Sequence, residues 1–156
     1  LPKRKFEMKV LVTGGAGYVG SSIADGLLNE GYEVIALDNL QQGHKEAVPR
    51  GVKFILADIC DAKALEEVFQ QFKIDAVMHM AAETVIEYST TDPKRYFQSN
   101  IVGGINLLNT MLMHNVHKLI FSSSAAVYGE PQTIPIEEEH PRNPINAYGE
   151  SKLMFE

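Results

Sequence analysis

Short apolar runs alternate with longer amphipathic stretches along most of this chain. Runs rich in β-branched residues predict strands, and apolar residues at helical spacing between them predict helices. The predicted strands are residues 9–13, 33–37, 52–57, 74–80 and 118–121, and the predicted helices are 20–30, 61–72, 93–114 and 147–156. Because most of these strands are apolar on both faces, we expect a doubly wound α/β fold, with a parallel sheet covered by helices on both sides.

The apolar positions also assign buried faces to two helices. Asp61 is expected to cap the helix 61–72. The buried residues of that helix are predicted to be Leu65, Val68, Phe69 and Phe72. The helix 93–114 is expected to begin at Pro93 and to turn inward Tyr96, Phe97, Ile101, Ile105, Leu108 and Leu112. The polar segment 41–51 and the proline-containing stretch 131–144 are expected to be loops.

A glycine-rich loop joins the first predicted strand to the first predicted helix. Gly14, Gly17 and Gly20 follow the strand and open the helix, as a dinucleotide-binding loop requires. Gly14 and Gly17 let the backbone turn tightly beside a pyrophosphate at the helix N-terminus, and Gly20 lets helix and strand pack closely. The alternative is a glycine-rich turn without a ligand. The strand–loop–helix–strand context favours a dinucleotide site of the Rossmann type.

Two carboxylates follow the second and third predicted strands. Asp38 lies where such folds place a carboxylate that accepts hydrogen bonds from the adenosine ribose. Because its charge would repel a 2′-phosphate, NAD is favoured over NADP as the cofactor. Asp58 has two interpretations of equal weight: it faces the adenine, or it caps a helix or holds a loop in place.

Tyr148 and Lys152 stand four residues apart in the last predicted helix. Residues four apart share a helix face, so the Lys152 ammonium can stabilise a phenolate at Tyr148. A phenol that titrates near ~10 in water needs such help to act as a base at neutral pH. Ser122–Ser124 end the fifth strand, where such folds bind their ligands. Taken alone the pair could equally be a solvated helix face, but together these features predict the acid/base group of a hydride-transferring enzyme.

Composition narrows the class of partner. The 156 residues and 45% hydrophobic content suit one packed domain, expected to span residues 8–156. The formal charge of -6 offers no basic surface to nucleic acid, and the apolar runs are strand-sized, so no membrane span is expected. The single cysteine, Cys60, is typical of the cytoplasm. Residues 1–7 lack a clear periodicity and are expected to be an extension or a cloning remnant.

The histidines give no sign of a metal site. None is paired with cysteine or another histidine at metal-ligand spacing, so no metal is expected. His79, at the end of the fourth predicted strand, is expected to be a packed residue rather than a catalyst.

From Met8 onward the sequence resembles the extended short-chain dehydrogenase/reductase family and, within it, the UDP-glucose 4-epimerase subfamily, over the NAD-binding N-terminal part only. The residues that carry the resemblance are 12–20, 38–40, 58–59, 79–82, Asn100, 121–129 and 148–152. The glycine loop and the Tyr-x-x-x-Lys spacing are specific for the superfamily. The segments 38–40 and 124–129 favour the epimerases.

The resemblance implies NAD-dependent epimerisation at C4 of a UDP-hexose, UDP-glucose or UDP-galactose, through a transient 4-keto sugar. Tyr148 would remove the 4-hydroxyl proton, Ser124 would hydrogen-bond the same oxygen, and Lys152 would hold the nicotinamide ribose. The implied cofactor contacts are Gly14, Gly17, Tyr18, Val19, Gly20, Asp38, Asn39, Asp58, Ile59, Met80, Ala81, Ala82, Asn100, Ser122, Tyr148 and Lys152.

Three positions differ from the patterns of related enzymes. Some epimerases have a lysine where Thr84 stands and a hydroxyl residue where Ala126 stands, which affects the sugar contacts. Related dehydratases and decarboxylases usually carry an acidic residue after their strand-five serine or threonine, where this chain has Ala125. Those reactions, or a reductase acting on another nucleotide sugar, are the nearer alternatives, and a non-catalytic NAD-binding module is the other class.

Members of this family are substantially longer and have a C-terminal domain that binds the nucleotide sugar. This sequence stops inside the predicted helix that bears Tyr148, so the substrate domain is expected to be absent and the α/β domain truncated at its C-terminus. We expect the isolated chain to bind NAD but to turn over UDP-sugars poorly. Leu153 and Phe155, left without their usual cover, indicate either a homodimer, which is the expected state, or domain exchange.

Overall fold

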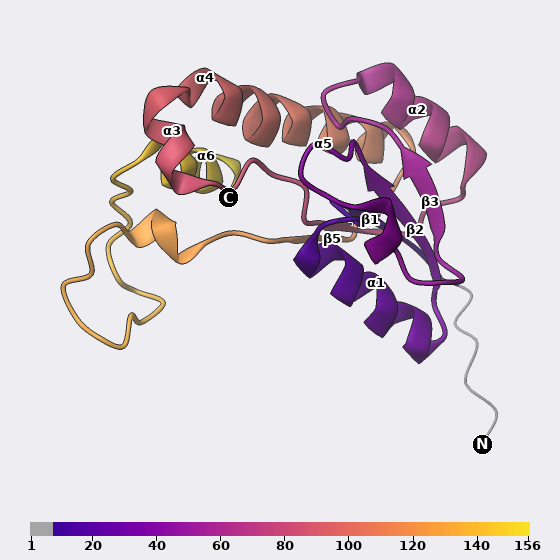
Figure 1. Ribbon diagram of the computed structural model, residues 1–156, viewed down its shortest axis with the longest axis horizontal. Coiled ribbons are helices and arrows are strands. Elements are labelled where there is room, and N and C mark those ends of the chain that lie inside the picture. The colour runs from indigo at the N-terminus through magenta and orange to yellow at the C-terminus, as the bar shows by residue number, and fades with distance from the viewer. Residues whose placement is uncertain (1–7) are drawn as a thin grey trace. The chain divides into compact units, whose positions relative to one another are not determined.

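A parallel five-stranded sheet is the centre of the computed structural model, which describes residues 8–156 (Figure 1). The expectation for residues 1–7 lies outside the described residues. The strands are β1 (Lys9–Thr13), β2 (Glu33–Asp38), β3 (Lys53–Leu56), β4 (Ala76–His79) and β5 (Leu119–Phe121). Their order across the sheet is β3-β2-β1-β4-β5, so the chain moves outward from β1 in one direction and then resumes on its other side. Ligands bind at such a reversal, beyond the carboxyl ends of the strands.

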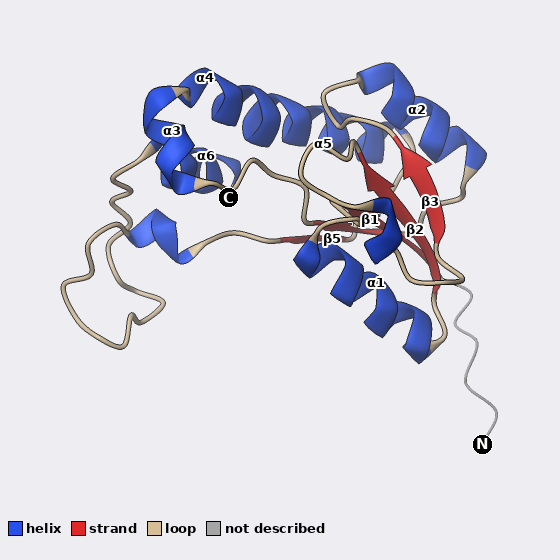
Figure 2. Ribbon diagram, viewed as in Figure 1, coloured by secondary structure: helices blue, strands red, loops and turns tan. Residues whose placement is uncertain are grey.

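Helices cover both faces of this sheet, as predicted. Alternate residues of β1 point to opposite faces: Val10 and Val12 pack with α1 (Tyr18–Glu30), and Leu11 faces the other way. That second face is covered by α2 (Ala62–Gln71) and α5 (Gly104–Met113). Figure 2 shows α1 and α2 on opposite sides of the strands. With both faces covered, the interior positions of the central strands are apolar on both sides, as Val10–Val12 in β1 and Val34–Leu37 in β2 show.

The described residues fall into two compact units. The first contains the chain up to Ala81 together with Ile105–Ser122, and therefore the whole sheet. The second contains Ala82–Gly104 and Ser123–Glu156. Its elements are α3 (Ile86–Thr91), α4 (Pro93–Tyr96), a π-helical segment η2 (Phe97–Gly103), a 3-10 turn η3 (Ala125–Tyr128) and α6 (Ala147–Phe155). The single domain expected for residues 8–156 stays a prediction.

The long helix predicted from Pro93 differs in its buried face. It consists of α4, the π-helical segment η2 and α5, and its wider π-helical turns displace the regular helical periodicity. Tyr96 is buried as predicted, but Ile105 is 47% exposed and Leu112 is 62% exposed. Leu107 and Met111 are buried instead. The predicted inward stripe is therefore wrong at Ile105 and Leu112, whereas Leu108 packs against the core as predicted.

Other local predictions differ less. Asp61 caps α2, since its Oδ1 accepts hydrogen bonds from the backbone N–H of Lys63 at 3.0 Å and of Ala64 at 3.1 Å. Strand β4 begins at Ala76 rather than at the predicted residue 74. Ile74 lies before the strand and is buried in the core, which explains its apolar side chain. The loop 41–51 contains a short 3-10 turn, η1 (Lys45–Ala47), and α3 was not predicted. Among residues 8–156, no helix is both long enough and apolar enough to cross a bilayer.

Candidate functional site

The glycine loop after β1 is built from close backbone contacts. Gly14 has φ +68, a left-handed conformation that favours glycine, and a Cβ there would lie 2.6 Å from the backbone nitrogen of Ala81. A Cβ on Gly20 would collide with the carbonyl oxygen of Gly14. The N–H of Gly17 donates to that same carbonyl at 3.1 Å. Gly14 and Gly20 are therefore required by packing, as the predicted loop geometry demands.

The N-terminus of α1 is open to a ligand. Its N-cap residue is Gly17, which has no side chain to occupy the space before the first turn. The next two residues are exposed, Tyr18 by 91% and Val19 by 52%. Backbone N–H groups at a helix N-terminus together with the helix dipole favour a phosphate. The loop and the first turn of α1 thus fit the pyrophosphate of a dinucleotide.

Asp38 ends β2 and holds the glycine loop in place. Its Oδ2 accepts a hydrogen bond from the N–H of Ala16 at 3.0 Å, and its Oδ1 accepts one from Leu40 at 2.8 Å. The side chain is buried. Because each carboxylate oxygen can accept more than one hydrogen bond, Asp38 can still bind the hydroxyls of a ribose. The role predicted for it is compatible with this geometry.

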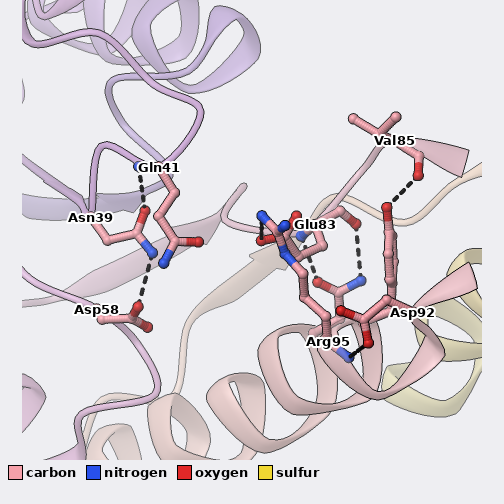
Figure 3. Close-up of polar contacts among 9 residues, drawn as sticks. Asn39, Gln41, Asp58, Glu83, Val85, Asp92 and Arg95 are labelled. Carbon is pink, nitrogen blue, oxygen red and sulfur yellow. Dashed lines mark hydrogen bonds and ion pairs between the residues drawn. The ribbon is translucent and has the colours of Figure 1, made fainter. Parts of the chain in front are cut away.

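Asp58 holds a loop between two strand ends (Figure 3). Asn39 donates from Nδ2 to Oδ2 of Asp58 at 2.9 Å, and the N–H of Cys60 donates to Oδ1 at 2.8 Å. Burial alone would raise the pKa of Asp58, but the hydrogen bonds from Asn39 and Cys60 outweigh burial and lower it. The loop-holding interpretation of Asp58 is confirmed, and its contact with adenine stays a prediction. Ile59 belongs to the core.

The carboxyl ends of the central strands are joined by a buried histidine. Nδ1 of His79, at the end of β4, lies 2.7 Å from Oγ1 of Thr13, at the end of β1. The carbonyl of His79 accepts a hydrogen bond from the N–H of Ser122 at 3.1 Å. His79 is 1% exposed, so the expectation of a packed strand-end residue is confirmed. Met80, Ala81 and Ser122 lie next to this junction along the chain. Their contacts with the cofactor stay predictions.

Tyr148 and Lys152 lie on α6 in the second unit. Asn146 caps this helix by accepting a hydrogen bond from the N–H of Gly149 at 2.8 Å. Tyr148 is 9% exposed and Lys152 is 3% exposed, so the alternative of a solvated helix face is wrong. Nζ of Lys152 lies 5.9 Å from the centre of the Tyr148 ring. Burial lowers the pKa of Lys152 to about 8, and a buried cation of this kind beside a phenol is typical of a catalytic site.

Ser124 begins the η3 turn in the same unit. Its Oγ accepts a hydrogen bond from the N–H of Ala126 at 3.1 Å, which orients the hydroxyl. The turn approaches α6 closely, because a Cβ on Gly149 would lie 2.5 Å from the carbonyl oxygen of Ala126. Glycine beside Tyr148 therefore lets the turn that bears Ser124 pack directly on the helix that bears Tyr148.

Asn100, expected to contact the cofactor, uses its side-chain amide within the protein. Its Oδ1 accepts from the N–H of Glu83 at 2.7 Å, and its Nδ2 donates to the Glu83 carbonyl at 3.1 Å. Nδ2 also donates to Oγ of Ser151 at 2.9 Å. Both amide hydrogens are thus used, so any cofactor contact of Asn100 must use another group. Ala82, the remaining predicted contact in this unit, is half-buried.

The ion pair between buried Glu83 and half-exposed Arg95, beside Asn100, was not predicted from the sequence. Glu83 is 6% exposed, and its Oε1 lies 2.8 Å from a terminal guanidinium nitrogen of Arg95 (Figure 3). The only signal in the sequence was a carboxylate four residues after the end of β4. Its arginine partner is twelve residues further along, in α4, whereas Glu83 lies between β4 and α3, so no helical or strand periodicity links the two.

The sheet order and the glycine loop define a dinucleotide-binding α/β protein. Residues 10–156 match the NAD dependent epimerase/dehydratase family, and the chain belongs to that family. The NAD dependence in the family's description agrees with the cofactor expected from Asp38.

Several relatives are similar over nearly all of the chain. The UDP-glucose 4-epimerase of Lactobacillus helveticus is 48% identical over 149 residues, which are 96% of this chain and 45% of that protein. UDP-arabinose 4-epimerase 1 of Arabidopsis thaliana is 46% identical, covering 94% of this chain and 37% of that protein. The crystal structure of the Thermus thermophilus UDP-glucose 4-epimerase in complex with NAD superposes with a TM-score of 0.91 at 43% identity, covering 95% of this chain and 48% of that one. The chain thus spans less than half the length of these proteins.

Proposed function

We propose that this chain is the NAD-binding and proton-transfer part of an enzyme that inverts C4 of a UDP-sugar through a transient 4-keto sugar. The observation that carries the proposal is the burial of Tyr148 and Lys152 together on α6, in the unit that also contains the oriented hydroxyl of Ser124. A buried phenol beside a buried ammonium is suited to proton transfer, and the burial of both groups is not typical of a solvent-exposed helix face.

Three side chains have distinct roles in the proposed reaction. Tyr148 takes the proton from the sugar 4-hydroxyl and returns it after the sugar has turned over. The hydroxyl of Ser124 donates a hydrogen bond to the same sugar oxygen, and Lys152 stabilises the phenolate with its positive charge. Lys152 stays largely protonated at neutral pH, because its pKa is lowered only to about 8.

NAD fits the residues present in the first unit. The glycine contacts and the uncapped N-terminus of α1 suit a pyrophosphate, and Asp38 suits the adenosine ribose. When bound, NAD would supply the acceptor for the hydride from C4 of the sugar and the donor for its return to the other face. We propose Gly14, Gly17, Tyr18, Val19 and Gly20 as the contacts to the pyrophosphate and Asp38 and Asn39 as the contacts to the ribose.

The relatives support the position of the chemistry on the sugar more strongly than the identity of the sugar. The similar proteins named for UDP-glucose and for UDP-arabinose are both 4-epimerases. A hexose and a pentose share C4 and its hydroxyl, the atoms on which Tyr148 and Ser124 would act. We therefore propose C4 epimerisation as the reaction and UDP-glucose and UDP-galactose as its substrates.

Two assays test the proposal separately. Calorimetric titration with NAD tests cofactor binding by the chain as it stands, and we expect saturable binding of one NAD per chain. Conversion of UDP-galactose is then measured for this chain and for a chimera that continues it with the C-terminal part of the Lactobacillus helveticus enzyme. We expect turnover in the chimera and little in the chain alone. A chimera that binds NAD without converting any UDP-sugar would refute the enzyme and favour a binding module.

A homodimer and a cytoplasmic location are further parts of the proposal. The exposed apolar side chains of α5, Ile105, Leu112 and Met113, support self-association, and the single free cysteine, Cys60, suits a reducing compartment. Sedimentation equilibrium should give twice the mass of 17.3 kDa for this chain. A monomer at every concentration would remove the dimer from the proposal.

A further inference from the structure

Helix α6 packs along the π-helical segment through three successive layers. The contacting pairs are Tyr96–Tyr148, Asn100–Ser151 and Gly104–Phe155. The contacting residues recur every four positions from Tyr96 to Gly104 and every three or four positions from Tyr148 to Phe155. Because residue numbers increase together in the three pairs, the two helical segments run in the same direction where they touch. The outer layers are an aromatic edge contact, with ring centres 6.4 Å apart, and a phenylalanine ring that occupies the space a side chain at Gly104 would need.

The middle layer is polar and fully buried. Asn100 is 3% exposed and Ser151 is 0% exposed. The N–H of Glu83 faces Oδ1 of Asn100, which determines the orientation of the amide and directs its Nδ2 to Ser151. The Ser151 hydroxyl donates its one hydrogen to the carbonyl of Tyr148 at 2.7 Å and accepts from Asn100 at 2.9 Å. Ser151 therefore connects the π-helical segment to the backbone of Tyr148, and it immediately precedes Lys152.

We propose that Ser151 is a positioning residue, whose hydroxyl, held by Asn100, sets the rotation of α6 and so the placement of Tyr148 and Lys152. A single polar contact among apolar layers can specify one register, because any other register leaves its groups unpaired. Rotating α6 by one residue, about 100°, would carry Ser151 away from Asn100. The effect of Ser151 on catalysis rests on the proposed function. Its effect on the position of Tyr148 and Lys152 does not.

The chain offers a matched control in Ser89. It is also 0% exposed, lies in a helix of the same unit, and donates to the carbonyl three residues earlier, that of Ile86, at 2.7 Å. Removal of either hydroxyl therefore deletes the same type of buried intrahelical bond. Only Ser151 links its helix to the π-helical segment through Asn100. Any difference between the two alanine variants measures that link.

The decisive comparison is Ser151→Thr against Ser151→Val, because the two side chains have nearly the same shape and only threonine keeps the hydroxyl. Hydrogen–deuterium exchange of residues 147–156 should be about tenfold faster in the valine variant than in the threonine variant. The NMR titration of the Lys152 side chain should move from a pKa of about 8 toward its ordinary value of 10.5 in the valine variant. Ser89→Ala should change neither measurement.

Equal exchange and equal Lys152 titration in the threonine and valine variants would overturn the proposal. If both variants unfold, Ser151→Ala against Ser89→Ala decides, and the same response in both would overturn it. In the active chimera, Ser151→Ala should lower kcat with little change in KM. Failure of NAD binding or turnover in the unsubstituted proteins would count against the proposed function alone, since exchange and titration need neither.

Discussion

The two predicted site groups use different parts of the chain. Around Gly14 and Asp38, the backbone makes the site: glycines remove side chains, a helix N-terminus offers N–H groups, and a carboxylate holds the loop. Around Tyr148 and Lys152, side chains make the site, and buried neighbours on other elements place them. A backbone site is tied to local sequence, whereas a side-chain site depends on the packing of helices. The two groups should therefore respond differently to substitution.

The largest expected effect separates chemistry from binding. Tyr148→Phe removes the proposed base and keeps the ring that contacts Tyr96, so turnover of UDP-galactose by the chimera should fall about 10²–10⁴-fold. NAD affinity and the free energy of unfolding should change little. Stopped-assay kinetics and calorimetry measure the two quantities. Retention of more than a tenth of the activity would remove Tyr148 from the proposed role.

A substitution in the glycine loop should act on structure and cofactor together. Gly14→Ala places a side chain at φ +68 against the backbone of Ala81, and we expect a loss of about 3 kcal/mol in the free energy of unfolding. NAD binding should disappear with it. Gly26→Ala is the matched control, because a Cβ there meets nothing within 4 Å and alanine favours the α1 helix by about 1 kcal/mol. Urea unfolding measures the free energy of unfolding of both variants. Equal values for Gly14→Ala and Gly26→Ala would contradict the close packing around Gly14.

The side-chain group should show its burial as a pH dependence. Burial lowers the pKa of Lys152 from 10.5 to about 8, so between these values the unfolded chain holds a proton that the folded chain has released. The free energy of unfolding should therefore rise as the pH increases from about 8 to about 10.5, with the cost of the buried charge fully present below pH 8. Lys152→Met should remove this rise and stabilise the chain at pH 7 by on the order of 2 kcal/mol.

Urea unfolding at pH 7 and pH 10 gives the test of Lys152. The contribution of Lys152 is obtained from the difference between the two chains at each pH, which cancels groups that titrate in both. A constant difference across this range would show that Lys152 is not buried as a cation.

The smallest of these effects concerns cofactor choice. In Asp38→Asn only one of the two terminal atoms of the side chain is an oxygen, so the hydrogen bond from either Ala16 or Leu40 loses its acceptor. The substitution also removes the negative charge that would repel a 2′-phosphate. NAD affinity should fall about tenfold, and the preference for NAD over NADP should narrow. Calorimetric titration with each cofactor measures both changes. An unchanged ratio of affinities would show that another residue selects the cofactor.

Sequence patterns were most informative where structure depends on neighbours along the chain. The strands of the sheet, the Asp61 cap and the glycine loop follow from local periodicity and backbone chemistry. The predicted stripe failed at Ile105 and Leu112, because a π-helical segment shifted the helical phase. Periodicity cannot reveal such a shift, since it assumes a constant number of residues per turn.

The sequence by itself determined the α/β fold, the dinucleotide loop and the pairing of Tyr148 with Lys152, because each depends on residues close together in the chain. Only the tertiary structure decided that both side chains are buried, that Asn100 binds Ser151, and that Glu83 has Arg95 as its partner. These contacts join segments whose separation obeys no local period. They depend on how helices pack, and packing is decided by shape and hydrogen-bond satisfaction in three dimensions.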